Sequence, residues 1–550
     1  MPDETPSTDP KSPAAPGAPT TRTAPVAGGT VHATPPPGRT QTVETAWAGH
    51  PGYTAPYATP PGFIGPRRPT LVERYWPKPA TPPSVALLAA CLAVGLVVAS
   101  TFYAPRLGLQ SGLVAAALTV VAVLATRGDD RPRSAYRTTA AGLAVALAWV
   151  PAVRDAAPTV ALSVVGALGL ALLAAADGRT WPSVFLTGPA TAVASVRGAL
   201  WAGSRFASVK RPAGLGPWLR GGALGLLVVW VVGALLASAD SAFAAVVDAV
   251  VPSLDLESLP GRAVLLVIGA VFALALATLA ASPPRWEAVR VPYRAGSTVE
   301  WAVPLVLVDA VLAVFVAVQA AVMFAARPDA LLGTGTTAAE RARQGFGQLV
   351  AVTLIAVVLL AWAGRRAGTD RSSGRRLLAL LGGGLVVLVL VVVASALRRM
   401  ALYEQYFGWT VLRLHVAAFE VWLAVVLVLC GLAWTVRRVD LVARGVVLAA
   451  AGALLGLNLL SPDAVAASAN VDRYAATGKV DLAYLARLSD DAVPALTRLP
   501  AADKVTVLEG RVAKHDPWYA VNLSRLRAAG ILPDTAPPSE LGRLEIPDQS

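Results

Sequence analysis

The stretch Leu377–Leu397 reads LLALLGGGLVVLVLVVVASAL and contains no charged residue. Arg375 and Arg376 precede it, and Arg398 and Arg399 follow it. A helix needs about 20 mainly apolar residues to cross the hydrocarbon core of a bilayer. This stretch therefore predicts a transmembrane helix that ends in cations on both sides.

Similar apolar runs recur along the chain, and together they predict an all-α fold, a polytopic transmembrane helix bundle with about eleven spans. The third and fourth runs are short, so one re-entrant hairpin is the alternative to two spans there. Pro151, Asp155 and Pro158 separate these two runs, which favours two spans. We expect the spans near 84–103, 108–126, 138–153, 157–176, 221–239, 262–281, 301–325, 344–363, 377–397, 413–435 and 441–460.

The composition agrees with a membrane protein, because 55% of the residues are hydrophobic and 15% are charged. A mean hydropathy of +0.58 implies more apolar surface than a soluble chain of this length can bury. The net charge of +13 lies mainly in short loops, and no nucleic-acid-binding signature accompanies it. Cys91 and Cys430 both lie inside apolar runs, so we expect no disulfide framework. The lipid bilayer is the expected partner, and nucleic acid is not.

Residues 1–83 form a Pro-rich segment that holds 20 of the 43 prolines. Such a composition does not offset the entropy of ordering, so we predict a disordered tail. Tyr53, Tyr57, Phe63 and Trp76 are its few adhesive residues. A solvated tail is the preferred interpretation, and a tail that docks a protein partner is the alternative. The first apolar run begins too late for a cleaved signal peptide, so it predicts a retained span.

Positive residues set the orientation of the spans, because Lys and Arg accumulate in cytoplasmic loops. Alternate loops carry 21 Lys and Arg residues on one side against nine on the other. We therefore predict a multi-pass protein of the cytoplasmic (cell) membrane, with its N-terminus cytoplasmic and its C-terminus extracytoplasmic. The stretch from Trp181 to Trp218 mixes basic and aromatic residues and predicts an interfacial segment.

Residues 461–550 are polar enough to predict a small soluble helical domain on the extracytoplasmic side. The alternative is a tail that packs on the last span, because ninety residues build only a modest core. Asp490 and Asp491 there resemble a helix N-cap more than a catalytic pair. The whole chain contains no phosphate-binding loop, dinucleotide fingerprint or serine elbow. Its four histidines are scattered, so we predict no catalytic residue, no cofactor and no metal site.

Polar side chains inside the apolar runs are the best functional candidates, since they are costly in hydrocarbon and usually face a bundle interior. Two interpretations stay open: polar contacts that hold helices together, or an outward-facing polar pocket or ion path. In the first, Arg413 pairs with Glu420 or with Glu404 in the loop before the span. The candidate intramembrane cluster comprises Asp309, Gln319, Gln344, Gln348, Tyr403, Glu404, Arg413, His415 and Glu420.

Several stretches of the chain resemble a bacterial, especially actinobacterial, family of membrane proteins known as domain of unknown function 4173, with relatives grouped as 4153. The resemblance covers roughly residues 84–530 and implies an integral membrane protein without an established activity. Arg341 departs from the family pattern, which tends to have an aromatic residue there. The stretches are Ala237–Ala244 (ASADSAFA), Val306–Phe324 (VLVDAVLAVFVAVQAAVMF), Ala342–Thr353 (ARQGFGQLVAVT), Arg398–Leu423, Asp481–Leu496 and Pro517–Ala528.

Three classes of function fit the sequence. We favour a transporter or permease for a small solute or ion, on the strength of Asp309 and the polar residues near the outer ends of the spans. The alternative is a membrane regulator or scaffold that binds partners through its tails. A membrane-embedded enzyme of lipid or envelope chemistry fits least well, because it needs an acid and a base such as Glu404 and His415 side by side.

Overall fold

A computed structural model describes residues 71–103, 106–127, 134–207, 258–289, 296–324, 346–367, 372–435 and 440–534, together with isolated positions between 221 and 243. The chain divides into two units, residues 1–68 and 69–550, and all described residues belong to the second. Of the described residues, 82% are helical and none lies in a strand. The predicted all-helical fold is thereby confirmed.

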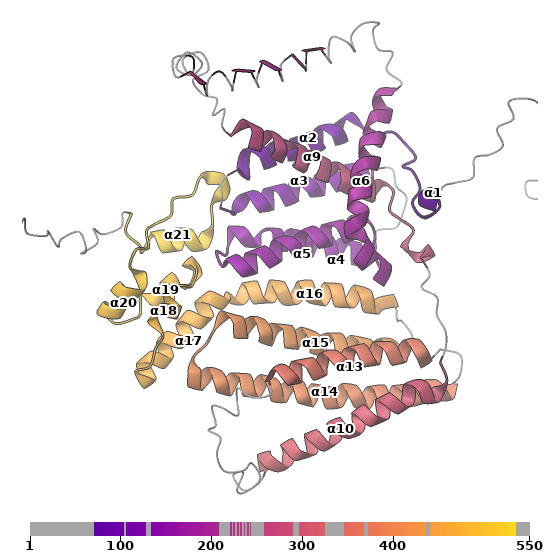
Figure 1. Cartoon of the computed structure of the whole chain (residues 1–550), viewed down its shortest axis with the longest axis vertical. Coiled ribbons are helices and arrows are strands. Elements are labelled where there is room, and N and C mark those ends of the chain that lie inside the picture. Colours follow the sequence, from indigo (N-terminus) through magenta and orange to yellow (C-terminus); the bar gives the residue numbers. More distant parts are fainter. Residues whose placement is uncertain are drawn as a thin grey trace, which may run out of the picture. The chain divides into compact units, whose positions relative to one another are not determined.

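The apolar runs form long helices in the described part of the chain (Figure 1). Seven of these are long and apolar enough to cross a membrane, namely α5, α9, α10, α13, α14, α15 and α16. The predicted span near 221–239 lies outside the described residues apart from isolated positions. The helices are α2 (Val85–Thr101), α3 (Leu109–Ala125), α4 (Ala135–Ala148), α5 (Ala157–Ala175), α9 (Leu259–Ala281), α10 (Thr298–Phe324), α13 (Phe346–Ala367), α14 (Ser372–Phe407), α15 (Val411–Thr435) and α16 (Asp440–Leu460).

Local sequence signals explain where several of these helices begin. The hydroxyl oxygens of Ser84 and Ser134 accept hydrogen bonds from the third amide beyond them, at 3.1 and 3.2 Å, and so cap α2 and α4. Pro158 occupies the first turn of α5, where its missing N–H is tolerated. Between α4 and α5 the chain makes the short 3-10 helix η2 (Val150–Ala152), which contains Pro151.

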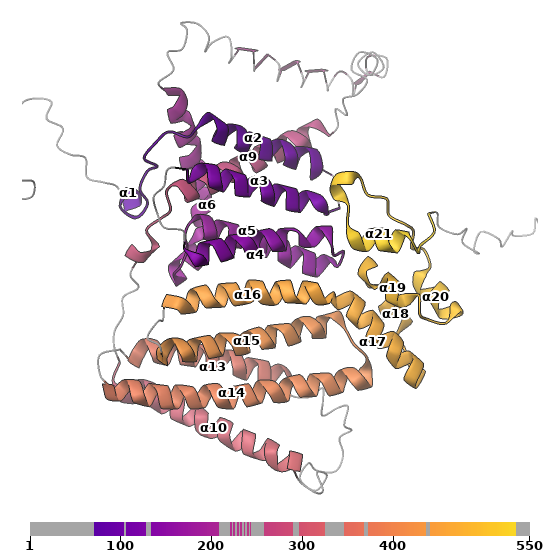
Figure 2. The same ribbon diagram turned by 180° about the vertical axis from the view of Figure 1, so that it is seen from behind.

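Helix α6 (Trp181–Ala207) runs crosswise to α2, α3, α5 and α9 in both Figure 1 and Figure 2. Its buried face, with Ser183 and Ala194, packs against the neighbouring helices, while Phe185, Val196 and Leu200 are exposed. A helix with one exposed apolar face and a crosswise course suits the boundary between headgroups and hydrocarbon.

The long helices pack into two groups with separate apolar cores. In the first group, α2, α3, α5 and α9 share one core, and α4 packs on α5. In the second group, α10, α13, α14 and α15 enclose residues such as Leu305, Leu385 and Leu427. Helix α16 contacts α15 on one side and α4 and α5 on the other, so it connects the two groups.

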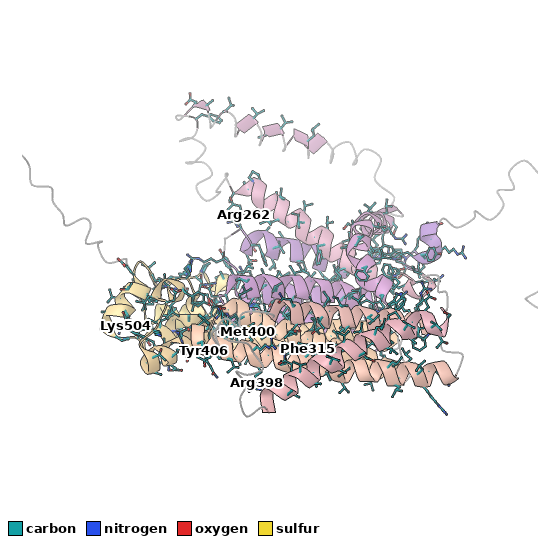
Figure 3. The ribbon with its side chains drawn as sticks, turned by 60° about the horizontal axis from the view of Figure 1, so that its bottom comes forward. Arg262, Phe315, Arg398, Met400, Tyr406 and Lys504 are labelled. Atoms are coloured by element: carbon teal, nitrogen blue, oxygen red, sulfur yellow. The ribbon has the colours of Figure 1, made fainter. Side chains whose placement is uncertain are left out.

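The C-terminal residues form short helices with apolar cores of their own around Leu485, Leu496 and Val493. They contact the loops at one end of the long helices: Val411 N–H donates to the Tyr484 hydroxyl (2.8 Å), and Arg473 donates to the carbonyl of Tyr406 (3.0 Å), a residue labelled in Figure 3. The elements are α17 (Pro462–Thr477), α18 (Leu482–Leu485), η4 (Asp490–Ala492), α19 (Val493–Leu496), α20 (Ala501–Leu508), η5 (Trp518–Ala520) and α21 (Leu523–Ala529).

The last residues of the predicted disordered tail, from Leu71 on, are described by the structure and pack against the helices. Residues 1–70 lie outside the described part, but the segment that follows helix α1 (Leu71–Tyr75) contacts α6 and the end of α9. Trp76 is buried and donates its indole N–H to the carbonyl of Ser282 (2.6 Å). Arg197 lies over the same ring, 4.8 Å from its centroid. A large aromatic side chain supplies enough buried area to order a short segment even in a Pro-rich context.

Candidate functional site

Glu420 of α15 is the most deeply buried acidic side chain among the described residues, with an exposed fraction of 0%. Within the described part of the chain, neither of its carboxylate oxygens has a hydrogen-bond partner. The Thr353 side chain of α13 faces this carboxylate, but its hydroxyl donates to the carbonyl of Leu349 (3.0 Å). A carboxylate in such a place is costly unless it gives up its charge.

Two other carboxylates lie in the same helix group at other depths. Asp309 of α10 faces Gly384 of α14. A methyl group at Gly384, as in alanine, would lie 3.6 Å from the Oδ2 atom of Asp309. Its Oδ1 is buried and has no partner among the described residues. Glu404 of α14 has an exposed fraction of 4%, and its Oε1 is likewise unpartnered in the described structure.

Arg413 does not pair with either neighbouring glutamate, which corrects the expected ion pair. Among the described residues, no ion pair joins Arg413 to Glu404 or Glu420. Its guanidinium lies over the Tyr403 ring, 4.3 Å from the centroid, and donates to the Gly408 carbonyl. The assignment of Glu404 to a loop was also wrong, because α14 continues to Phe407. Arg413 and Tyr403 meet because they flank the sharp turn between α14 and α15.

The remaining candidates that the structure describes are not gathered around Glu420. His415 bonds through Nδ1 to the Val411 carbonyl (2.8 Å) and approaches the Thr159 hydroxyl of α5 with Nε2 (3.5 Å). Glu404 and His415 share no hydrogen bond in the described structure, so the arrangement offers no acid–base pair there. Gln348 is exposed, Gln319 is half-buried, and Gln344 lies outside the described residues. The eight candidates that the structure describes therefore lie in several separate environments.

The chemistry open to these carboxyls is limited by their isolation. Among the described residues, no group of three or more His, Cys, Asp or Glu side chains is placed to hold a metal ion. A structural metal needs several such ligands at once. A single buried carboxyl can instead bind and release a proton, which changes its charge without any further protein ligand.

A second cluster escaped the sequence analysis and lies where the C-terminal helices meet the loops of the first helix group. Arg525 of α21, 4% exposed, donates to Asp516 (2.6 Å) and to Asp155 (2.7 Å). It also donates to the carbonyls of Leu107 (2.9 Å) and Ala520 (2.7 Å). The signal in the sequence was an arginine between Leu523 and Leu526, within an apolar stripe. Asp516 and Ala520 are close to it in sequence, but Asp155 and Leu107 lie 370 and 418 residues away.

Asp491 belongs to the same cluster and does not cap its own helix as expected. Its Oδ2 accepts the backbone N–H groups of Asp155 (2.9 Å) and Ala156 (3.0 Å), which lie at the start of α5. Ser489 holds the N-cap position of η4, without a side-chain cap bond. The Asn522 side chain donates to the carbonyls of Pro151 (2.7 Å) and Arg154 (2.8 Å). The buried polar groups of the α4–α5 loop are thus satisfied from the C-terminal helices.

The buried carboxyl of Asp463 in α17 should make the stability of the folded protein depend on pH. Burial raises the pKa of this carboxyl, the Ser489 hydrogen bonds oppose the shift, the Asp491 carboxylate adds to it, and His415 opposes it. Because the pKa is higher in the folded state, the native state favours the protonated form. Stability is therefore lost as the pH rises from the ordinary Asp range through the raised value.

We expect Asp463→Asn to remove this loss, since the Asn Oδ1 still accepts the Ser489 N–H. Melting temperatures in detergent over a pH series should show wild type and variant alike in acid and the variant more stable near neutral pH. Asp472→Asn is the matched control, because Asp472 lies exposed on the same helix. Parallel pH profiles for Asp463→Asn and wild type would contradict the prediction.

The long apolar helices and the carboxyls buried among them define a helical membrane protein. A comparison with known families identifies this one: residues 139–499 match the family described as Domain of unknown function (DUF4153), and the chain belongs to it. This is one of the two related groups indicated by the sequence motifs. No curated protein and no solved structure matches the chain.

Proposed function

We propose that the protein moves protons, alone or together with a small solute, through the helix group α10, α13, α14 and α15. The observation that carries this proposal is Glu420, which is fully buried without a hydrogen bond among the described residues. Asp309 and Glu404 provide further carboxyls in the same group, each with an unpartnered oxygen in the described structure. Ionisable residues at membrane depth are typical of proton relays in pumps and transporters.

The depths of the three carboxyls support a route rather than a single site. Asp309 lies eleven residues after the start of α10, or about 16 Å along the helix axis. Glu420 lies nine residues after the start of α15, about 14 Å from the opposite end of the group. Glu404 is three residues from the end of α14, close to that same end. A proton entering at the Glu404 end would meet the three groups in succession as the helices rearrange.

The experiment is a flux assay on the full chain in proteoliposomes that contain a pH-sensitive dye. An imposed membrane potential should drive faster internal acidification than in empty liposomes, either without solute or with one of a panel of amino acids, sugars and nucleosides. If no condition exceeds empty liposomes, the proposal fails. Removing residues 1–70 should leave the flux intact, whereas a regulator that acts through its tail would lose its effect.

We also propose eleven spans in the cytoplasmic membrane, with the C-terminal helices on the extracytoplasmic side. The excess of Lys and Arg at the opposite loops supports this orientation. The contacts of the C-terminal helices support it too, because they join the loops near Leu107, Pro151 and Val411, which alternate with the arginine-rich loops along the chain. The span count includes α4 and α5 as two spans and a span near 221–239, with α6 in the interface.

Reporter fusions test this orientation. A phosphatase joined after Gly530 should be active, and a fluorescent protein joined there should be dark. Fusions after Arg127, in a loop of the opposite set, serve as the matched control and should show the reverse pattern. An inactive phosphatase and a bright fluorescent protein after Gly530 would mean that a span has been miscounted, most simply at 138–176.

A further inference from the structure

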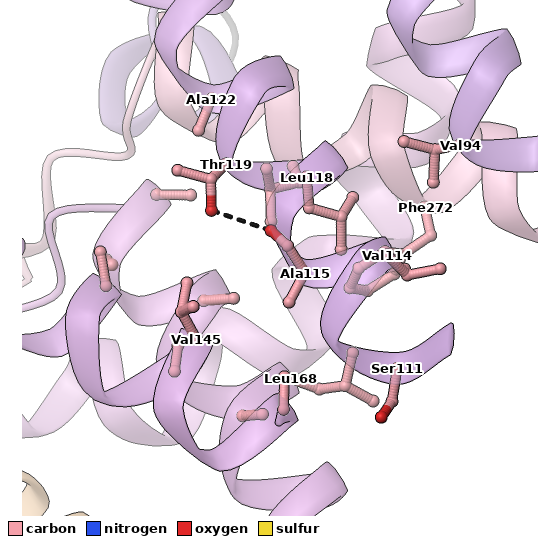
Figure 4. A pocket seen from close by; sticks show the side chains of 18 of the residues that line it. Val94, Ser111, Val114, Ala115, Leu118, Thr119, Ala122, Val145, Leu168 and Phe272 are labelled. Carbon is pink, nitrogen blue, oxygen red and sulfur yellow. Dashed lines mark hydrogen bonds between the residues drawn. The ribbon is translucent and has the colours of Figure 1, made fainter. Parts of the chain in front are cut away.

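An apolar cavity of about 360 Å³ lies between α2, α3, α4, α5 and α9, away from the buried carboxyls (Figure 4). Its walls are formed by aliphatic and aromatic side chains such as Val94, Leu118, Val145, Leu168 and Phe272. A cavity of this volume lies within the range of ligand sites in proteins. Because its walls lack polar partners for water, it stays dry or takes an apolar guest.

The few polar groups on the walls already have hydrogen bonds within their own helices. The Thr119 hydroxyl donates to the Ala115 carbonyl (2.8 Å), drawn as the dashed line in Figure 4. The Ser111 hydroxyl donates to the Gly108 carbonyl (2.8 Å). One charged side chain lines the cavity within the described structure: Arg137, in the first turn of α4. No ion pair of Arg137 occurs among the described residues.

The cavity is elongated along the helices. On α3 its lining runs from Ser111 to Ala122, and on α4 from Arg137 to Ala148. Each stretch advances eleven residues, or about 16 Å. That is close to half of the roughly 30 Å hydrocarbon core, the depth that one leaflet occupies. Arg137 marks one end of this slot, at the side of the arginine-rich loop between α3 and α4.

We propose that this cavity binds one acyl chain of an anionic phospholipid, whose phosphate is held by Arg137. The chain fills the apolar slot, and the guanidinium supplies charge and hydrogen-bond donors for the phosphate at the level of the headgroups. The two features match one molecule, because a phospholipid joins an apolar chain to a phosphate at one end. The site does not depend on the proposed proton route, which uses another group of helices.

The test measures the melting temperature of the delipidated full chain in detergent with three additives. Phosphatidylglycerol should raise the melting temperature, and a diacylglycerol with the same chains should raise it clearly less. Glycerol 3-phosphate, which lacks the chains, should have no effect. A shift from glycerol 3-phosphate equal to that from phosphatidylglycerol would assign the site to a free phosphate and overturn the proposal.

Two variants with matched controls locate the binding. Ala115→Phe fills the cavity and should remove the response to phosphatidylglycerol, while Ala116→Phe on the exposed face of α3 should keep it. Arg137→Gln should lower the response to that of diacylglycerol, while Arg127→Gln, outside the lining, should not. An unchanged response in Arg137→Gln contradicts the phosphate contact.

A second readout covers the case in which Ala115→Phe does not fold. Mass spectrometry of the protein purified from membranes should find phosphatidylglycerol retained by wild type and by Arg127→Gln, and at least tenfold less by Arg137→Gln. Equal retention in the three proteins would overturn the proposal.

Discussion

Replacing Arg525 by alanine should detach or unfold the C-terminal helices. We expect it to lower the free energy of unfolding by about 3–5 kcal/mol. The substitution leaves the carboxylates of Asp155 and Asp516 without their main counter-charge, and Asp516 is almost fully buried. It also leaves the carbonyls of Leu107 and Ala520 without this donor. Removing one partner from a buried charge cluster costs more than the cluster contributes as a whole, because the remaining charges are no longer compensated.

The measurement is thermal unfolding in detergent combined with limited proteolysis. In Arg525→Ala, cleavage between residues 461 and 530 should appear at temperatures where the wild type resists. Arg527→Ala is the matched control on the same helix, since Arg527 is exposed and should change stability by no more than about 0.5 kcal/mol. Arg525→Lys should rescue only in part, because an ammonium cannot reproduce the forked contacts of a guanidinium. Wild-type melting and proteolysis in Arg525→Ala would show that the cluster does not hold these helices.

Replacing Glu420 by glutamine should abolish the flux in proteoliposomes while the folded protein remains abundant. Glutamine has nearly the shape of a protonated glutamate but cannot release a proton. Since the carboxyl has no hydrogen bond to lose among the described residues, the melting temperature should not fall. Loss of flux together with unchanged stability separates a functional role from a structural one.

Two further variants sharpen this result. Glu300→Gln alters an exposed carboxylate of α10 that pairs with Arg366 (3.2 Å), and its flux should be that of wild type. The double variant Arg413→Gln with Glu420→Gln should show additive changes in stability, since no hydrogen bond or ion pair joins the two side chains in the described structure. Full flux in Glu420→Gln would show that Glu420 is not part of the proposed route. A double variant that is more stable than the sum of the single changes predicts would show that Arg413 and Glu420 do form an ion pair.

The sequence predicted the helices well because a bilayer leaves few alternatives. An uncharged run such as Leu377–Leu397 must satisfy its backbone hydrogen bonds internally, and a helix does so within one segment. The ends were less well predicted. Helix α14 extends ten residues beyond this run, where the rings of Tyr403 and Phe407 pack against each other at a tilt (4.5 Å between centroids) and Glu404 is buried. Trp76 likewise orders a segment whose composition alone predicted disorder.

The contacts of the buried polar residues could not be predicted from single helices. Arg413 and Glu420 are seven residues apart, close to two helical turns, so both lie on one face of a helix. Two positions on one face can nevertheless contact different neighbours. Arg413 lies beside the turn after Phe407 and finds Tyr403, whereas Glu420 reaches α13 and an apolar core. Likewise, two of the partners of Arg525, Asp155 and Leu107, are 370 and 418 residues away, and no local pattern predicts these two contacts.

By itself, the sequence determined that this protein is helical and suited to a membrane, because hydrophobicity summed over about 20 residues is a local quantity. The tertiary structure decided which polar groups are paired and which are not, because pairing depends on contacts between distant segments. It left Glu420 without a hydrogen bond among the described residues and enclosed Arg525 among carboxylates. It also placed Arg137 at the end of an apolar cavity.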